Sequence, residues 1–314
     1  MERISTATIY NGIIANLMSA QNQESVINAK VSSGNNASDL QGYASSAETL
    51  MAMQTVQSQV AGYVNTGKVV AAKLSSQDTA LGQLGSAATA GTSAITNALA
   101  AGNGDTVMQA LQSAFNSAVQ GLNTTFNGQY LFGGGQVNTP PVSATTLTDL
   151  TNAPSIASLF HNDQMIQSAQ VDQNTTLQTG FLADQLGTPL FNAFQAIVAY
   201  NQGPNGPFSG NLTPAQSAFL QSQIASLNTV GTALTTAAGK NGLLQSEVTN
   251  TQADLGARQS TMEGLIGNIT NTDMAKAASD LQQAQLAVQA SAKIFSSLAN
   301  SSLVSLLPAS PVTG

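Results

Sequence analysis

Apolar side chains near the start of the chain recur every seven residues in two registers. These registers hold Tyr10, Leu17 and Val31, and Ile13, Ala20 and Ile27. Glu24 is the one polar residue that interrupts the repeat. A period of about 3.5 residues predicts a long helix that packs one apolar stripe along a second helix.

The same period returns at the end of the chain. Its registers hold Met274, Leu281, Val288 and Phe295, faced by Ala277, Ala284, Ser291 and Leu298. An earlier run from Leu220 to Ile269 keeps one register except at Asn241. Before this run, Thr213, Pro214 and Gln216 have the spacing of an N-cap, a first-turn proline and a capping-box partner. We therefore expect two long helices after residue 213.

The heptad pattern also extends inward from the N-terminal end. It continues from Met53 to Leu84, with breaks at Gly67 and Gln77, and a shorter repeat covers Met108 to Phe126. These runs predict further helices that pack along one seam.

The middle of the chain has a different pattern. The seven-residue period is lost from about Gly128 to Gly187, where glycine, proline and threonine are frequent. Within it, Ile166 to Leu177 predicts strands joined by a turn at Asp172 to Asn174. A helical pattern resumes from Leu186 to Tyr200.

The fold class that follows is mainly α. We expect a long antiparallel coiled-coil-like helical rod formed by the N- and C-terminal segments, with a small β-containing outer domain inserted. The expected segments are an N-terminal assembly helix (1–40), the two parts of the rod (41–130 and 187–269), the inserted outer domain (131–186) and a C-terminal assembly helix (270–314).

Composition removes several classes of function. Only 7% of the residues are charged, and no lysine or arginine lies between Lys73 and Lys240. Nucleic-acid binding needs clustered cations, so we expect none. The chain has no cysteine, one histidine and no tryptophan, and no apolar run approaches the length of about 18 residues that spans a bilayer. We expect no disulfide, no metal site and no membrane insertion.

Few residues suggest catalysis. His161 and the nearby Asp163 are the pair that an enzyme would use, but a lone histidine is more often a surface side chain. Gly133 to Gly135 has no nearby lysine to hold a phosphate, so it predicts a turn. The acids are scattered, and several are expected as solvated charges on helix faces or as N-caps, for example Asp105, Asp184 and Asp273. We expect no enzyme and no cofactor.

The apolar stripes lie where many domains have polar tails. The outward faces of the same segments hold neutral side chains, and a surface with little charge associates easily. We expect the two ends to pack side by side. Because they are apolar along one face yet lack an intramolecular partner, we also expect them to become ordered only in an assembly. The candidate assembly interface consists of Tyr10, Ile13, Leu17, Ile27, Val31, Met274, Leu281, Val288, Phe295 and Leu298.

Short motifs occur in a fixed order at both ends. They are Arg3 to Thr6, Val31 to Gly34, Asn36 to Asp39, Ile269 to Ala275, Gln289 to Ser291 and Asn300 to Leu307. In these motifs and their placement, the chain resembles the bacterial flagellin superfamily. Leu40 stands where the family usually has a second acidic residue.

A further motif favours one branch of that family. Gly128 to Gly134 reads Gly-Gln-Tyr-Leu-Phe-Gly-Gly, which resembles the Gly-x-Tyr-Leu-Phe-x-Gly motif of hook–filament junction proteins. The resemblance implies a structural subunit of the extracellular flagellum, secreted by the flagellar type III export apparatus. It also implies three kinds of partner: further copies of the chain, other flagellar axial proteins (hook-associated proteins and flagellin) and an export chaperone.

Two other interpretations remain at this stage. The first is a filament flagellin or a flagellin-like cell-surface protein. The second is a polysaccharide-binding adhesin, which would need a binding face on the central domain, where aromatic residues are few.

Overall fold

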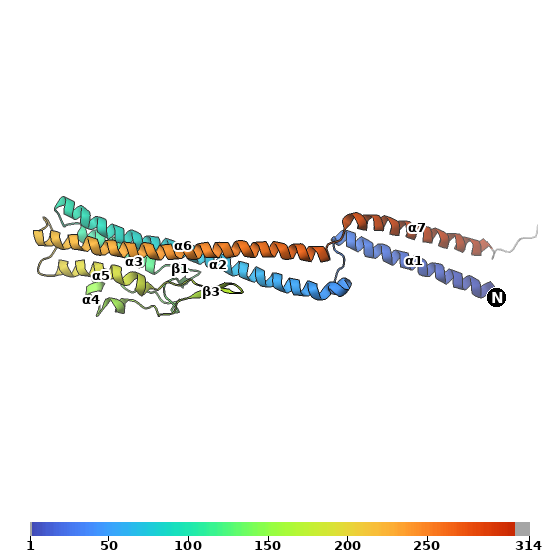
Figure 1. Ribbon diagram of the computed structural model, residues 1–314, viewed down its shortest axis with the longest axis horizontal. Coiled ribbons are helices and arrows are strands. Elements are labelled where there is room, and N and C mark those ends of the chain that lie inside the picture. The colour runs from blue at the N-terminus through green and yellow to red at the C-terminus, as the bar shows by residue number, and fades with distance from the viewer. Residues whose placement is uncertain (1, 305–314) are drawn as a thin grey trace, which may run out of the picture. The chain divides into compact units, whose positions relative to one another are not determined.

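The computed structural model describes the backbone of residues 2–304 and the side chains of residues 8–298. Its helices are α1 (Glu2–Ser33), η1 (Leu40–Ser46), α2 (Ala47–Ala101), α3 (Val107–Leu122), α4 (Asp149–Asn152), η2 (Ile156–Leu159), α5 (Ala183–Gln202), α6 (Pro214–Thr270) and α7 (Met274–Val304). Its strands are β1 (Thr125–Phe126), β2 (Gln129–Tyr130), β3 (Ser168–Asp172) and β4 (Thr175–Gln178). The strands form two antiparallel pairs, β1 with β2 and β3 with β4. The expected fold class, mainly helical with a small β-containing insert, is confirmed (Figure 1).

The chain forms two compact units. The terminal unit comprises Met1–Ser58 and Ser260–Gly314, and the central unit comprises Gln59–Gln259. The boundaries of the five expected segments differ from those of the two units, which divide the chain after Ser58 and after Gln259. The expected boundary after residue 186 falls within α5. Residue 40 begins η1, residue 130 ends β2 and residue 270 ends α6.

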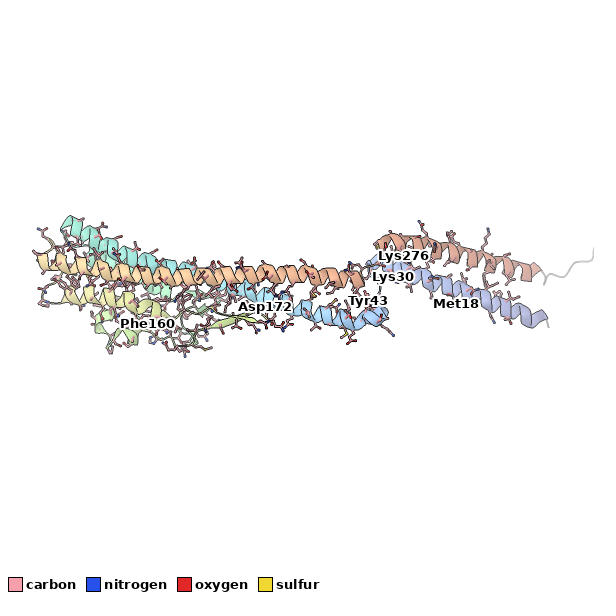
Figure 2. The ribbon with its side chains drawn as sticks, viewed as in Figure 1. Met18, Lys30, Tyr43, Phe160, Asp172 and Lys276 are labelled. Carbon is pink, nitrogen blue, oxygen red and sulfur yellow. The ribbon has the colours of Figure 1, made fainter. Side chains whose placement is uncertain are left out.

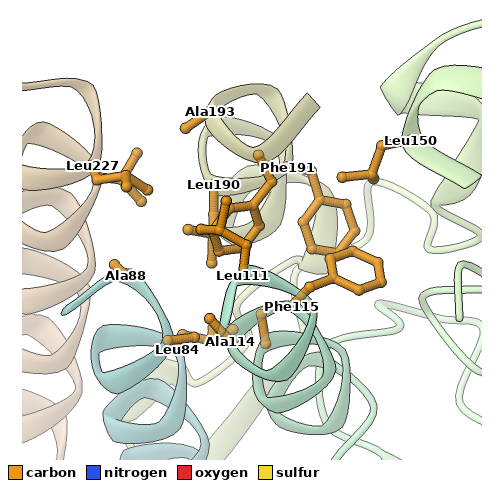
Figure 3. Packing of buried hydrophobic residues seen from close by; sticks show 14 of the residues in the cluster. Leu84, Ala88, Leu111, Ala114, Phe115, Leu150, Leu190, Phe191, Ala193 and Leu227 are labelled. Atoms are coloured by element: carbon orange, nitrogen blue, oxygen red, sulfur yellow. The ribbon is translucent and has the colours of Figure 1, made fainter. Parts of the chain in front are cut away.

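The core of the central unit lies where α2, α3, α5 and α6 meet. Phe115 of α3 is fully buried, with its ring centroid 5.2 Å from that of Phe191 and 6.4 Å from that of Phe194 on α5. Leu84 of α2 and Leu227 of α6 belong to the same cluster (Figure 3). Heptad positions of α2 and α6 thus contribute aliphatic side chains to the core, and α3 and α5 contribute the phenylalanine rings.

The expected start of α6 is confirmed in detail. Thr213 Oγ1 accepts a hydrogen bond from the Gln216 backbone N–H at 3.2 Å, and Gln216 Oε1 accepts one from the Thr213 N–H at 3.0 Å. This reciprocal pair is a capping box, which satisfies two backbone donors at the helix start.

The segment around Gly128 joins the helices to the insert. Asn127 and Gly128 both have positive φ (51° and 77°), as a two-residue hairpin turn between β1 and β2 requires. The next residues, Leu131 and Phe132, are buried in the core cluster. Most of the junction-like motif therefore has a clear structural role, because it turns the chain and then anchors the insert.

The β3–β4 hairpin falls where the sequence predicts it, with the turn between Asp172 and Thr175. Its buried Val171 packs against Val70 and Leu74 of α2 and Val248 of α6 in a second, smaller cluster. The hairpin therefore lies along the two long helices of the central unit (Figure 1).

Candidate assembly interface

In the terminal unit, α1 and α7 pack along each other in opposite directions (Figure 1). At one end, the Tyr10 ring lies 5.3 Å from the Phe295 ring. At the other end, the backbone N–H of Asn36 donates to the Thr270 carbonyl oxygen at 2.7 Å. Residue numbers rise along one helix as they fall along the other, so the heptad stripes of the two helices face each other. We call the line between these stripes the terminal seam.

The ten predicted interface residues follow this seam with one exception. Nine of them are half-buried: Tyr10, Ile13, Leu17, Ile27, Val31, Leu281, Val288, Phe295 and Leu298. Met274, at the first position of α7, is 49% exposed. The expected pairing of the two ends is confirmed. The pair also forms within a single chain, because two antiparallel stripes of equal period can cover each other without a second copy.

Burial along the terminal seam is incomplete. The side chains of α1 and α7 that are buried, among those described, belong to three alanines: Ala20, Ala277 and Ala284. The larger seam side chains keep part of their surface in water, whereas Phe115 in the central unit is fully buried. The small alanines let the helices approach closely but contribute little apolar area.

Large apolar side chains also lie outside the terminal seam. Five of them are more than half exposed: Ile9, Met18, Val26, Leu286 and Ile294. On each helix these residues occupy different heptad positions, so they do not form a single stripe. Figure 2 marks Met18 on α1. The sequence pattern did not single out these residues, because they lie outside the heptad registers that identified the terminal seam.

The two connections next to the helix pair are tied together by Asn36. Its Nδ2 donates to the carbonyl oxygens of Ile269 (3.1 Å) and Asn271 (2.9 Å), and its Oδ1 accepts from Thr272 Oγ1 at 2.9 Å. The Thr272 backbone N–H donates to the Gly34 carbonyl oxygen at 2.8 Å. We call this set of bonds the asparagine clasp. It fixes where α1 ends relative to where α7 begins.

Polar and charged groups gather at the clasped end of the pair. Lys276 and Asp280 form an ion pair of 2.9 Å on α7, and this partner raises the pKa of Lys276. A groove of about 840 Å³ runs between the helices there, lined by Val26 and Lys30 of α1 and by Lys276 and Asp280 of α7 among others. Figure 2 places Lys30 and Lys276 at this end. Asp273 caps α7 as expected, since its Oδ1 accepts from the Ala275 and Lys276 N–H groups.

The residues considered for catalysis do not form a site. His161 is exposed, and Asp163 accepts hydrogen bonds from the backbone N–H groups of Gly135 (2.7 Å) and Met165 (3.0 Å). These bonds hold the pKa of the Asp163 carboxyl below its usual range. Gly134 has a φ of +64°, which fits the expected turn. Within the described part of the chain, no cluster of histidine and acidic side chains could hold a metal ion, and no helix is sufficiently long and apolar to cross a membrane.

The other two acids expected as caps behave differently. Asp105 accepts from the Gly210 N–H at 2.6 Å and so joins the loop after α2 to the loop before α6. Asp184 lies in the first turn of α5 and accepts from the side chains of Asn162 and Gln164. Both carboxylates organise loops, which single-sequence spacing does not reveal.

The two terminal helices pair in opposite directions, and the middle of the chain forms a helical unit of its own. These features define a class of helical proteins with paired termini. Family comparison agrees with this class. The model of the bacterial flagellin N-terminal helical region matches residues 4–137, and the model of the bacterial flagellin C-terminal helical region matches residues 224–307. The chain belongs to the bacterial flagellin family.

Solved structures with a similar fold include two flagellar proteins. A flagellar hook-associated protein of Vibrio parahaemolyticus aligns with a TM-score of 0.58 and 15% identity, over 71% of this chain and 96% of that one. FlgL of Bacillus cereus aligns with a TM-score of 0.52 and 12% identity, over 70% of this chain and 99% of that one. Among curated proteins, none matches the sequence significantly.

Proposed function

We propose that this chain is a non-enzymatic structural subunit of the bacterial flagellum that assembles at the hook–filament junction. The flagellin family supports the flagellar role. The two similar structures, a hook-associated protein and FlgL, support the junction position, as does the motif from Gly128 to Gly134. Its partners would be further copies of the chain, hook-associated proteins and flagellin.

The observation that carries the assembly role is the surface of the α1–α7 pair. Its seam residues are only half-buried, and five more large apolar side chains are over half exposed. Apolar surface that a single chain leaves in water favours association, by roughly 25 cal/mol per Å² buried. Because these side chains point in several directions, neighbours on more than one side would be needed to cover them.

The ten predicted interface residues keep a role in this proposal. The nine half-buried ones would hold α1 against α7. The exposed residues Ile9, Met18, Val26, Leu286 and Ile294 would contact neighbouring subunits. Met274, which is half exposed at the start of α7, would belong to the second group.

Secretion would follow the flagellar type III export route to the extracellular flagellum, with a chaperone that shields the apolar face of α7 before assembly. The support is the apolar surface itself, since Leu286 is 65% exposed and Ile294 is 57% exposed. A chain with this surface needs protection from premature association.

Deletion of the gene tests the junction position. Cells without the protein should carry hooks with no filament and release filament protein into the medium, because filament subunits would have no junction to grow from. Hooks that still carry normal filaments would contradict the junction position. Loss of the filament protein itself would indicate a filament flagellin.

A further inference from the structure

In the central unit, the heptad positions of α2 and α6 line the contact between these two helices, which we call the α2–α6 seam. Two of these positions hold polar residues where the repeats predict apolar ones. Gln77 and Asn241 interrupt the two repeats, and both side chains are fully buried. Asn241 Nδ2 donates to the Leu74 carbonyl oxygen at 2.9 Å, and Leu74 lies one turn before Gln77 on α2. The two breaks in the sequence pattern therefore meet at the same level of the folded unit.

In each of these side chains the amide nitrogen donates a hydrogen bond, but the amide oxygen has no partner among the described residues. Gln77 Nε2 donates to the Thr179 carbonyl oxygen at 2.9 Å, but Gln77 Oε1 and Asn241 Oδ1 are buried and accept no hydrogen bond from the described residues. A buried acceptor without a partner costs free energy, because it has given up its bonds to water. This level of the seam is therefore weaker than an apolar layer of the same size.

The polar level separates two apolar clusters. On one side lies the main cluster, which begins at Ala80 on α2 and ends near Leu234 on α6 and contains the phenylalanines of α3 and α5. We call this part the core block. On the other side lies the small cluster of Val70, Leu74, Val171 and Val248.

We call the second side the stem, which comprises residues 59–74 of α2, residues 244–259 of α6 and the β3–β4 hairpin. Its seam contains further small or polar positions. Gly67 faces the Gln252 side chain, which occupies the space that a larger residue would need, and Gln252 Nε2 is also buried without a partner among the described residues. Thr251 is buried as well. The stem thus buries far less apolar area than the core block.

Besides the apolar packing of Val171, two polar contacts hold the hairpin against α2 and α6. Lys73 Nζ donates to Gln167 Oε1 at the base of the hairpin, one turn before Gln77. At the turn of the hairpin, the Arg258 guanidinium contacts the Asp172 carboxylate at 3.4 Å, and the Arg258 side chain is 57% exposed. An exposed ion pair of this kind contributes little stability.

From these contacts we propose that Gln77 and Asn241 form a hinge layer that divides the central unit into two parts with separate opening equilibria. The stem, with its hairpin, opens while the core block stays closed. Proteins open locally in cooperative units, and a unit boundary is expected where buried apolar contact is interrupted. The hinge layer gives the subunit a defined place at which the stem can loosen or repack without unfolding of the core block.

Hydrogen exchange of the full-length chain in low denaturant tests this proposal. Backbone amides in residues 60–74, 244–258 and the hairpin should exchange at similar rates and respond alike to denaturant. Amides in residues 81–98, α3 and α5 should form a second set, whose exchange rates are at least about tenfold slower. If the two sets exchange at the same rates and respond equally to denaturant, the unit opens as one body and the proposal is wrong.

A double variant tests the cause. Gln77→Met with Asn241→Leu keeps the side-chain volumes and makes the layer apolar, so the difference between the two sets should shrink several-fold. The matched control, Gln83→Met with Asn250→Leu, makes the same exchanges at exposed positions of the same helices and should leave the difference unchanged. An unchanged difference in the first variant would show that the layer is not the boundary. If that variant fails to fold, Asn241→Leu alone serves the same comparison.

Discussion

Asn36 and Thr272 are joined by a hydrogen bond of 2.9 Å between Thr272 Oγ1 and Asn36 Oδ1. The same Asn36 side chain donates to two backbone carbonyl oxygens in the connection between α6 and α7. One side chain thus fixes the end of α1 against the beginning of α7.

Replacement of this residue should loosen the terminal pair. Asn36→Ala removes three side-chain hydrogen bonds, each worth about 0.5–1.5 kcal/mol, although the site is exposed and water can replace part of the loss. We expect faster amide exchange in α1 and α7 and no change in the central unit. Asn35→Ala is the control, since the clasp does not use that side chain. Equal effects of the two variants would show that the clasp has no special role.

The terminal seam should not tolerate a charge. Leu281→Asp or Val288→Asp places a carboxylate against α1, where a charge without a partner costs up to several kcal/mol when it is desolvated. We expect α7 to lose its protection from exchange and the chain to stop assembling. Gln289→Asp, at the exposed neighbouring position, should have neither effect. Normal polymerisation of the Val288→Asp protein would mean that the seam is not needed for assembly.

The exposed apolar residues should behave differently from the seam. Met18→Glu with Leu286→Glu changes two side chains that are 61% and 65% exposed, so the α1–α7 pair should stay folded. If these residues contact neighbouring subunits, the monomer should keep its circular dichroism spectrum and thermal unfolding but fail to polymerise. Polymerisation at the normal rate would remove these residues from the proposed interface.

The core of the central unit should depend strongly on Phe115. This side chain is fully buried against Phe191 and Phe194, so Phe115→Ala should destabilise the unit by about 3–5 kcal/mol. Denaturant unfolding followed by circular dichroism measures this loss. Exchange in residues 8–30 of α1 should not change, because they belong to the other unit.

Acid should loosen one loop of the insert before the core. Backbone hydrogen bonds from Gly135 and Met165 lower the pKa of Asp163 below its usual 3.8. A depressed folded pKa means that the stabilisation is complete above the unfolded pKa and is lost as the pH falls through the folded value. The Gly135 amide should therefore exchange faster, relative to the intrinsic rate, below about pH 4. Asp163→Asn should remove this pH dependence, and a dependence that persists would point to another group.

Periodicity alone predicted much of the fold. The stripes from Tyr10 to Val31 and from Met274 to Leu298 define α1 and α7, because a 3.5-residue repeat has few other physical meanings. The capping box at Thr213 and the hairpin turn after Asp172 are also local signals, and both are confirmed.

Contacts between distant segments could not be predicted in the same way. Asn36 appeared in the sequence only as part of a family-like motif, and its partners follow some 230 residues later. Gln77 and Asn241 appeared in the sequence as polar residues that interrupt two separate heptad repeats. Their meeting depends on the register between α2 and α6, which a single sequence does not specify.

Amide hydrogen exchange of the full-length protein, before and after polymerisation, tests the central claim most directly. A helix pair with a half-buried seam should be weakly protected in the monomer, and neighbours that cover its exposed apolar residues should slow its exchange strongly. We predict a large gain of protection in residues 8–33 and 274–298, and little change in the core block around Phe115. If α1 and α7 exchange at the same rates in the monomer and the polymer, the paired termini are not the assembly interface.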